Sequence, residues 1–262
     1  MKRTRLLLLL VLLMTAATGV WAQQTLTVYD GPFYENYSPA NICYIDEYTR
    51  SQTVIPSTAL TAMKGCDITA MKFYSNSIAA SGTIDYSFDV YLKEVSYTAF
   101  AESSPTFEPK SSCTSVHQGK LSISNYELTI TFSKPFHYNG GNLLLGMENT
   151  SIVTYYDITF VGRDTGSSLS NISIHHDTDL ASASIKQTAF IPKTTFTYVV
   201  PTYTLTLDPA PVTKATVTID DQAATPDENG KIADVKANSS VKLNANDGYM
   251  FKKVKVKKTP KE

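Results

Sequence analysis

The side chains best suited to metal chemistry are two adjacent histidines and two nearby carboxylates. His175 and His176 are followed by Asp177 and Asp179, and imidazole and carboxylate groups are common ligands of zinc. Adjacent residues of an extended chain point to opposite sides, so the two imidazoles do not converge without a special turn. We therefore interpret this segment as a solvent-exposed loop and predict no metal ligands in the chain.

A second candidate for chemistry is a cysteine four residues before a histidine, Cys113 and His117. This spacing brings side chains together on a helix but not in a strand or loop, and the intervening residues are typical of a strand or loop. A catalytic cysteine needs a histidine in spatial contact and a third group that orients it. The sequence also contains no GxSxG, HExxH, phosphate-binding or dinucleotide-binding motif. We therefore expect no catalytic residues and predict that the protein is not an enzyme.

Two acidic pairs, Asp220-Asp221 and Asp227-Glu228, could supply oxygen ligands to calcium. They lack the alternating acidic spacing of a dedicated calcium loop. Asp and Asn are common turn residues, which explains both pairs more simply. Structural calcium is therefore unsupported, and we expect no cofactor.

Aromatic residues near the N-terminus are the strongest candidates for ligand binding. The cluster consists of Tyr29, Phe33, Tyr34, Tyr37, Tyr44 and Tyr48. Exposed phenols could stack on sugar rings or anchor a protein partner. Tyrosines also bury readily at the edge of a β-sandwich, and this interpretation stays open beside the first. The candidate ligand-binding residues are thus Tyr29, Tyr34, Tyr37, Tyr44 and Tyr48.

The elements that must position these residues are predicted to be short β-strands. Apolar and polar residues alternate with period two at 88–92 and 128–132, as in half-buried strands. Residues 143–147 are apolar throughout, which is typical of a strand covered on both faces. One short helix is expected after Pro56, with Leu60 and Met63 on one side and Gly65 at its end. This pattern predicts an all-β protein, with a jelly-roll β-sandwich over residues 23–200.

Prolines mark a boundary after the sandwich. Pro201, Pro209 and Pro211 favour extended chain and remove backbone donors. Short strand patterns follow at 216–219, 232–235 and 241–243 around the turn at 227–230. We predict a small Ig-like or β-repeat domain over residues 201–262. Its last eleven residues hold six lysines alternating with valines, which is typical of an edge strand protected from aggregation or, alternatively, of attachment to an anionic cell envelope.

The N-terminus is typical of a secretory signal peptide, residues 1–22. Lys2, Arg3 and Arg5 precede an apolar run from Leu6 to Met14, and small residues lead to Ala22. Three of the 23 basic residues lie in this segment, which leaves about 20 against 24 acidic ones and a net charge of about −4. Nucleic acid is therefore an unsuitable partner. No later segment is apolar enough to span a membrane as a helix. The protein is expected to be exported, either secreted or held at the outer cell surface.

Export exposes three cysteines to oxidising conditions, Cys43, Cys66 and Cys113. Three thiols cannot pair completely. One disulfide with one remaining thiol and a fully reduced set both remain open, because free cysteine is among the most buried residue types.

Several strand and turn phrases resemble a module of secreted Bacteroidetes surface proteins. These phrases lie at residues 25–31, 34–48, 90–95, 138–144 and 191–196, and the closing phrase at 246–254 is similar to small β-repeat units that follow such modules. The module is the jelly-roll adhesin domain related to those of gingipains (cleaved adhesin domains). The resemblance implies a non-enzymatic binding or spacer unit and transfers no catalytic residues.

Together these features predict an exported, non-enzymatic, adhesin-like binding protein of a Bacteroidetes-type bacterium. The expected partner is a glycan or a host or cell-surface protein. A carbohydrate-binding jelly roll and a structural subunit of a surface appendage are the two alternatives.

Overall fold

The regular structure of this protein is almost entirely β-strand. The computed structural model describes residues 23–35, 48–76, 82–149, 159–176, 184–207, 213–237 and 239–249. Strands dominate these ranges, and the helical residues form three short 3-10 turns. The predicted all-β fold class is therefore confirmed. Within the same ranges, no helix has the length and apolar character needed to cross a membrane.

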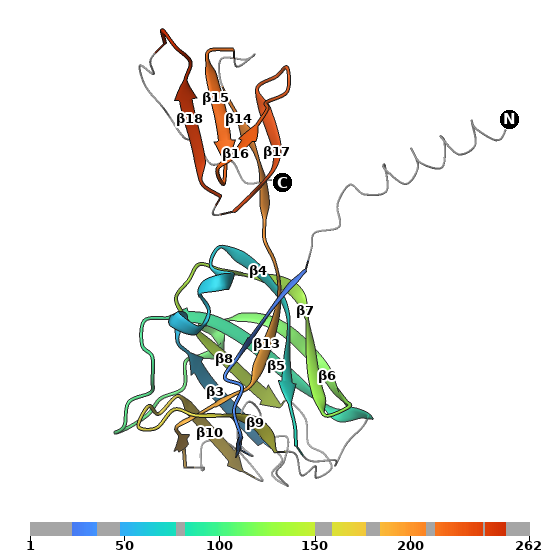
Figure 1. The fold of residues 1–262 in the computed structure, drawn as a ribbon. Helices are drawn as coiled ribbons and strands as arrows, with labels where there is room; N and C mark the ends of the chain where they lie inside the picture. Colours follow the sequence, from blue (N-terminus) through green and yellow to red (C-terminus); the bar gives the residue numbers. More distant parts are fainter. Residues whose placement is uncertain are drawn as a thin grey trace, which may run out of the picture.

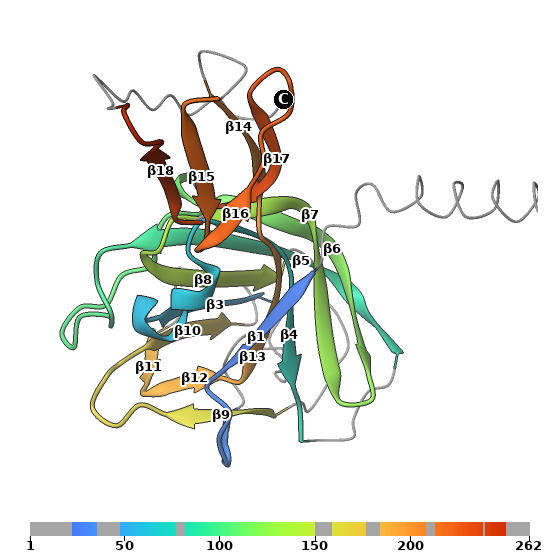
Figure 2. The ribbon, with the colours of Figure 1, turned by 45° about the horizontal axis from the view of Figure 1, so that its top comes forward.

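Ten antiparallel strands form one large, curled sheet (Figures 1 and 2). In spatial order they are β1 (Gln24–Val28), β13 (Thr194–Val199), β4 (Cys66–Tyr74), β7 (Glu127–Tyr138), β6 (Thr114–Ser124), β5 (Gly82–Val95), β8 (Asn142–Asn149), β3 (Tyr48–Ile55), β10 (Asn171–His176) and β11 (Lys186–Thr188). The whole of β1 pairs with β13. The first strand of the chain and the last strand of this sheet therefore lie side by side.

A three-stranded sheet packs against the concave side of the large one. Its strands are β12 (Phe190–Pro192), β9 (Phe160–Asp164) and β2 (Phe33–Glu35). Phe160 of β9 meets Phe73 of β4 edge to face, with ring centroids 6.3 Å apart. Phe160 and Ile191 both belong to the main core cluster. The small sheet therefore supplies the second layer of the sandwich.

The main core fills the space inside the curled sheet. Its residues alternate along each strand, as the period-two pattern predicts. Those on β5 and β7 are Phe88, Val90, Leu92, Leu128, Ile130, Phe132, Phe136 and Tyr138. The predicted strands at 88–92 and 128–132 are thus present with their apolar residues on the core side.

Strand β8 is covered on both faces, as its unbroken apolar sequence predicts. Leu143, Leu145 and Met147 belong to the main core, whereas Leu144 belongs to a second cluster on the outer face of the sheet. Gly146 also faces outward, and a Cβ added there would lie 1.9 Å from the ring of Tyr91. The glycine therefore allows the tyrosine ring to lie directly on the strand.

The expected helix after Pro56 is two successive 3-10 turns, η1 (Ser57–Ala59) and η2 (Thr61–Met63). Leu60 and Met63 are fully buried, as expected from their spacing. Gly65 ends the segment with a φ of 76°, which is strained for other residues.

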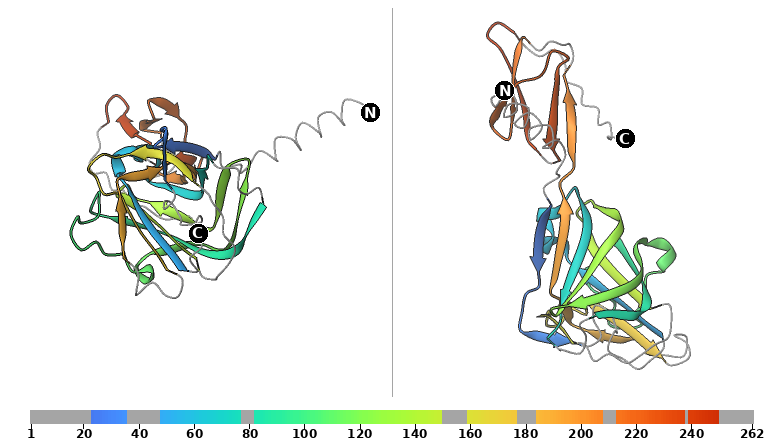
Figure 3. Two further views of the ribbon diagram at one scale, coloured as in Figure 1. Left: turned by 90° about the horizontal axis from the view of Figure 1, so that it is seen from below. Right: turned by 90° about the vertical axis from the view of Figure 1, so that its right-hand side faces the viewer.

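The segment after β13 forms two small sheets of its own. One pairs β14 (Thr202–Thr206) with β17 (Lys231–Lys236), and the other contains β16 (Gln222–Ala224), β15 (Ala215–Ile219) and β18 (Val241–Ala245). Figure 3 shows them beyond one end of the large sheet, joined to it by the extended chain from β13 to β14. No described strand of this group pairs with a strand of the large sheet. The lysine-rich segment at 252–261 lies outside the described residues.

Two of the three cysteines are within the described residues, and both are free thiols. Cys66 is buried in the main core, and Cys113 is half-buried beside the second cluster. Burial raises the pKa of each thiol. A disulfide between Cys66 and Cys113 is therefore absent, and Cys43 lies outside the described residues.

Candidate functional site

A long loop covers the outer face of the large sheet. This covering loop, residues 96–113, connects β5 to β6 and contains the 3-10 turn η3 (Lys110–Ser112). Phe100 of the loop is buried in the second cluster, together with Val54, Tyr91, Leu144 and Ile172 from the strands beneath. The half-buried loop residues Tyr97, Phe107 and Cys113 pack against this cluster. The apolar residues of the loop thus fix it on β3, β5 and β8.

Gln52 of β3 fastens the loop through its backbone. Its amide Nε2 donates to the carbonyl oxygen of Glu108, and the Glu108 N–H donates to Gln52 Oε1, each over 2.8 Å. The same Nε2 donates to the hydroxyl of Tyr91 at 3.2 Å. Gln52 is fully buried, and leaving a buried amide unpaired is costly. These bonds therefore hold Glu108 at a fixed position above the sheet.

Ion pairs hold the end of the covering loop that leads into β6. Lys110 Nζ lies 2.5 Å from Asp89 Oδ2 and 3.7 Å from Glu148 Oε1. Glu148 also pairs with Arg50, whose Nε lies 2.8 Å from Glu148 Oε2 and whose guanidinium carbon lies 5.5 Å from the centroid of Phe107. An isolated surface ion pair contributes little to stability, but these four charged groups form a network, which is the arrangement in which such pairs can contribute.

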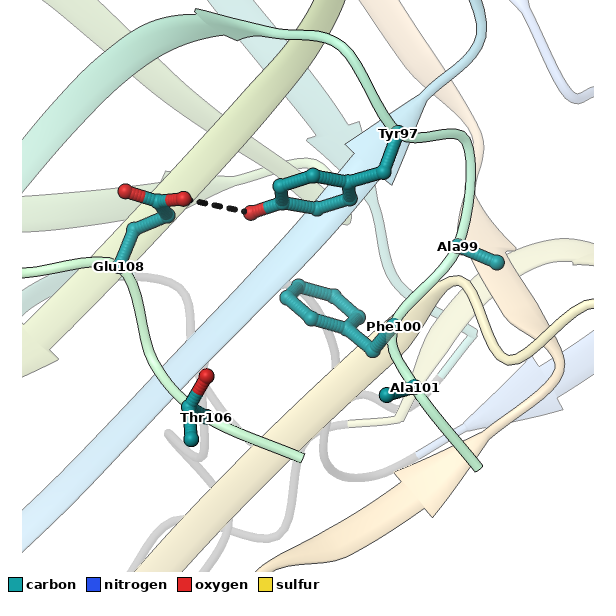
Figure 4. A pocket seen from close by; sticks show the side chains of 6 residues that line it. All are labelled: Tyr97, Ala99, Phe100, Ala101, Thr106 and Glu108. Carbon is teal, nitrogen blue, oxygen red and sulfur yellow. Dashed lines mark hydrogen bonds between the residues drawn. The ribbon is translucent and has the colours of Figure 1, made fainter. Parts of the chain in front are cut away.

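A pocket of about 380 Å³ opens between the two arms of the covering loop (Figure 4). Its lining comes from Tyr97, Ala99, Phe100, Ala101, Thr106 and Glu108. The Tyr97 and Phe100 rings lie 5.8 Å apart at an interplanar angle of 55°. Figure 4 shows the Glu108 carboxylate reaching toward Tyr97, with Thr106 on the same arm as Glu108. The volume falls within the range of small-molecule sites.

The charges in this pocket are fixed by neighbouring groups. Lys93 donates to Glu108 Oε2 over 2.5 Å, and the Tyr97 hydroxyl donates to Glu108 Oε1 over 3.1 Å. The hydrogen bond from Lys93 is the main cause that lowers the pKa of Glu108. Burial, with Glu108 nearby, raises the pKa of Tyr97. At neutral pH the pocket therefore offers an ionised, hydrogen-bonded acceptor beside two apolar rings, which suits a ligand with a donor group and an apolar face.

The structure does not test the tyrosine cluster as a whole. Tyr29 is half-buried against the main core with a φ of 54°, and burial raises the pKa of its hydroxyl despite the nearby Arg163. Tyr34 lies in β2 and Tyr48 begins β3, but the structure does not describe their side chains. Tyr37 and Tyr44 lie outside the described residues. Their role in binding stays a prediction.

The other candidates have separate partners. Cys113 Sγ contacts the carbonyl oxygen of Pro109 at 3.5 Å, whereas His117 Nδ1 lies 3.2 Å from the carbonyl oxygen of Thr131. Asp220, just after β15, accepts hydrogen bonds from the Ser239 hydroxyl and the Ser240 N–H, which lie just before β18.

The remaining candidates give no metal cluster within the described residues. Asp227 accepts bonds from two backbone N–H groups of its own turn. His175 and His176 are the last two residues of strand β10, so the predicted loop is wrong at these two positions, and Asp177 and Asp179 lie outside the described residues. No group of three or more metal-binding side chains gathers in the described part of the chain.

Sequence reasoning missed the loop pocket entirely. Its residues come from a polar stretch with several serines and prolines, which is the composition of an ordinary surface loop. The available signal was the presence of Phe100 and Phe107 within that stretch, since large apolar residues in a polar loop indicate that the loop packs on something.

No family model, no curated protein and no solved structure matches this chain. The strands and the sheet order define an all-β sandwich, and the covering loop closes part of the outer face of its large sheet. The resemblance to secreted adhesin modules stays a prediction.

Proposed function

We propose that this protein is an exported, non-enzymatic, adhesin-like binding protein that holds its partner through the loop pocket. The observation that supports it best is a preformed pocket on a loop that Gln52 and the Lys93–Glu108 pair hold rigidly. Rigid sites lose little entropy on binding. The signal-peptide sequence supports export, and the resemblance to secreted Bacteroidetes modules supports an adhesive role at the cell surface. The partner is a glycan or a cell-surface protein that presents a hydrogen-bond donor beside an apolar face.

The first test is an array of glycans and matrix proteins probed with residues 23–262. Thr106 lines the pocket and is exposed, so Thr106→Trp fills the pocket without disturbing the core. We expect this variant to lose binding by at least about tenfold, the equivalent of about 1.4 kcal/mol. Thr129→Trp, at an exposed position of β7, is the matched control and should bind normally.

Two results would contradict the proposal. Equal binding by both tryptophan variants would place the ligand elsewhere on the molecule. A blank array together with self-association in solution would favour the structural-subunit alternative.

A further inference from the structure

The two arms of the covering loop are held independently, so the width of the loop pocket is fixed. On one arm, the Phe100 N–H donates to the carbonyl oxygen of Leu169 over 2.9 Å. The carbonyl oxygen of Ala101, on the same arm, accepts from Gln187 Nε2 of β11 over 2.8 Å. Gln52 of β3 holds the other arm. A pocket with walls fixed in this way selects its ligand by size and by the few polar groups in its lining.

The polar groups of the pocket are hydrogen-bond acceptors for the most part. The side chain of Glu108 is 21% exposed, so its carboxylate is open to a ligand. Its two oxygens have about four acceptor positions, of which Lys93 and Tyr97 take one each. The Tyr97 hydroxyl donates its only proton to Glu108 and keeps its oxygen lone pairs for a ligand. A ligand that matches this lining therefore brings several donors.

Lys93 makes the charge of the pocket neutral. Its Nζ lies 2.5 Å from Glu108 Oε2 and also donates to Ser112 Oγ over 3.1 Å. Lys93 does not itself line the pocket. A cationic ligand meets the nearby ammonium charge and a carboxylate that is already paired, and an anionic ligand meets the carboxylate oxygens. Ligands of either charge are therefore disfavoured, and a neutral one is favoured.

The apolar side of the pocket lies next to these acceptors. Tyr97 and Phe100 come from one arm, and Figure 4 shows the Tyr97 hydroxyl at the Glu108 carboxylate on the opposite arm. A flat ligand that lies against the Tyr97 ring can therefore reach Glu108 with the polar groups at its edge. The ligand thus needs an apolar face and several neutral donors around its rim.

We propose that the loop pocket takes a single neutral sugar residue, whose adjacent hydroxyls donate to Glu108 and whose C–H face lies against Tyr97. A pyranose has several hydroxyl donors at its edge, no net charge and an apolar face that fits an aromatic ring. This inference rests on the proposed function, because it names a glycan as the partner of the same pocket. Lys93 is a positioning residue, which sets the preference for neutral sugars through its pairing with Glu108.

The test compares sugars that differ in charge alone. Methyl glycosides of glucose, galactose and mannose are each compared with their 2-amino and 6-amino derivatives and their uronic acids. Calorimetry on residues 23–262 is done at about pH 6, where the amino groups are protonated. We expect at least one neutral glycoside to bind at least about tenfold more tightly than its charged forms. Thr106→Trp, which fills the pocket, should abolish this binding.

Lys93→Met tests the origin of the preference. Lys93 is 30% exposed, so methionine fits there without disturbing the core. The variant leaves Glu108 without its ammonium partner, and we expect the ratio of neutral to amino sugar affinity to fall about tenfold. A purely structural role of Lys93 would instead weaken all sugars equally. Lys93→Arg keeps the charge and should keep the preference, and Lys134→Met, at an exposed position of β7, is the matched control.

The outcomes separate this inference from the proposed function. Equal binding of neutral and charged sugars would overturn the inference, and so would sugar binding that Thr106→Trp leaves unchanged. Binding of a matrix protein but of no sugar, lost in Thr106→Trp, would overturn the inference alone, whereas a blank array and no sugar binding would overturn both. If Lys93→Met fails to fold, Glu108→Gln should weaken the neutral sugar about tenfold, and unchanged affinity would overturn the site.

Discussion

At the scale of single residues, Glu94 shows how one half-buried carboxylate fixes a turn. Its oxygens accept from the Asn139 N–H over 2.7 Å, from Asn139 Nδ2 over 2.9 Å and from the Gly141 N–H over 2.6 Å. Burial by itself raises the pKa of Glu94, but these hydrogen bonds outweigh it and lower the pKa. The turn at residues 138–142 is thus held by a residue from β5.

This arrangement predicts a pH dependence of stability. A carboxylate with a lowered folded-state pKa stabilises the fold above its unfolded pKa of about 4.5, and this contribution is lost as the pH falls through the folded value. We expect Glu94→Gln to cost about 1–2 kcal/mol at pH 7 and to lose less stability than the unaltered protein between about pH 5 and 3. Urea unfolding across this range measures both.

The control for this experiment is Glu102→Gln, at an exposed position of the covering loop. Its stability curve should follow that of the unaltered protein. Parallel curves for the Glu94 and Glu102 variants would contradict the assigned role of Glu94.

At the scale of elements, the covering loop is positioned by a strand far away in the sequence. The side-chain amide of Gln52 makes two hydrogen bonds to the Glu108 backbone, as the backbone of a neighbouring strand would. The outer apolar face of β3, β5 and β8 is thereby closed without a further strand. The pocket lies between the two arms of the loop, because Phe100 on one arm and Phe107 on the other contact this face separately.

Gln52→Leu should release the loop while keeping the strand. It leaves the Glu108 N–H and carbonyl group without a partner, which costs about 1–3 kcal/mol. Hydrogen exchange should become faster across residues 97–113 and stay unchanged across β7. Gln118→Leu, at an exposed position of β6, is the control. Equal protection of the loop in both variants would show that the apolar packing alone holds it.

At the scale of the whole molecule, the main core is complete before the chain reaches β14. The buried residues of the main cluster run from Val28 to Tyr198, with Val200 packed against them. Val217 and Val235, in the small sheets, are buried outside this cluster. The two sets of sheets therefore bury their apolar residues separately.

A chain of residues 23–201 should consequently fold by itself. Ending the chain at Pro201 keeps the whole of β13 and also Val200, which packs against the main core. We expect a single cooperative thermal transition within about 5 °C of that of residues 23–262, because a domain of this size buries enough surface for independent stability. A broad or absent transition would show instead that the small sheets stabilise the large one.

The sequence by itself determined the local structure of this protein. Alternation at 88–92 and 128–132 predicted strands and the side that each residue faces, because a strand's pattern depends on neighbours two positions apart. The unbroken run at 143–147 predicted a strand covered on both faces. The glycine at position 65 marked the end of a short helical segment, although the segment is 3-10 rather than the expected single helix.

The tertiary structure alone decided which faces meet. Gln52 and Glu108 are 56 positions apart, and Ser51 pairs with Ser173 from a distant strand. Neither contact has a local signature, because a hydrogen bond between remote segments leaves no periodic pattern in either of them. The sequence therefore indicated at most, through Phe100 and Phe107, that the loop packs on something, and only the tertiary structure placed the pocket residues together.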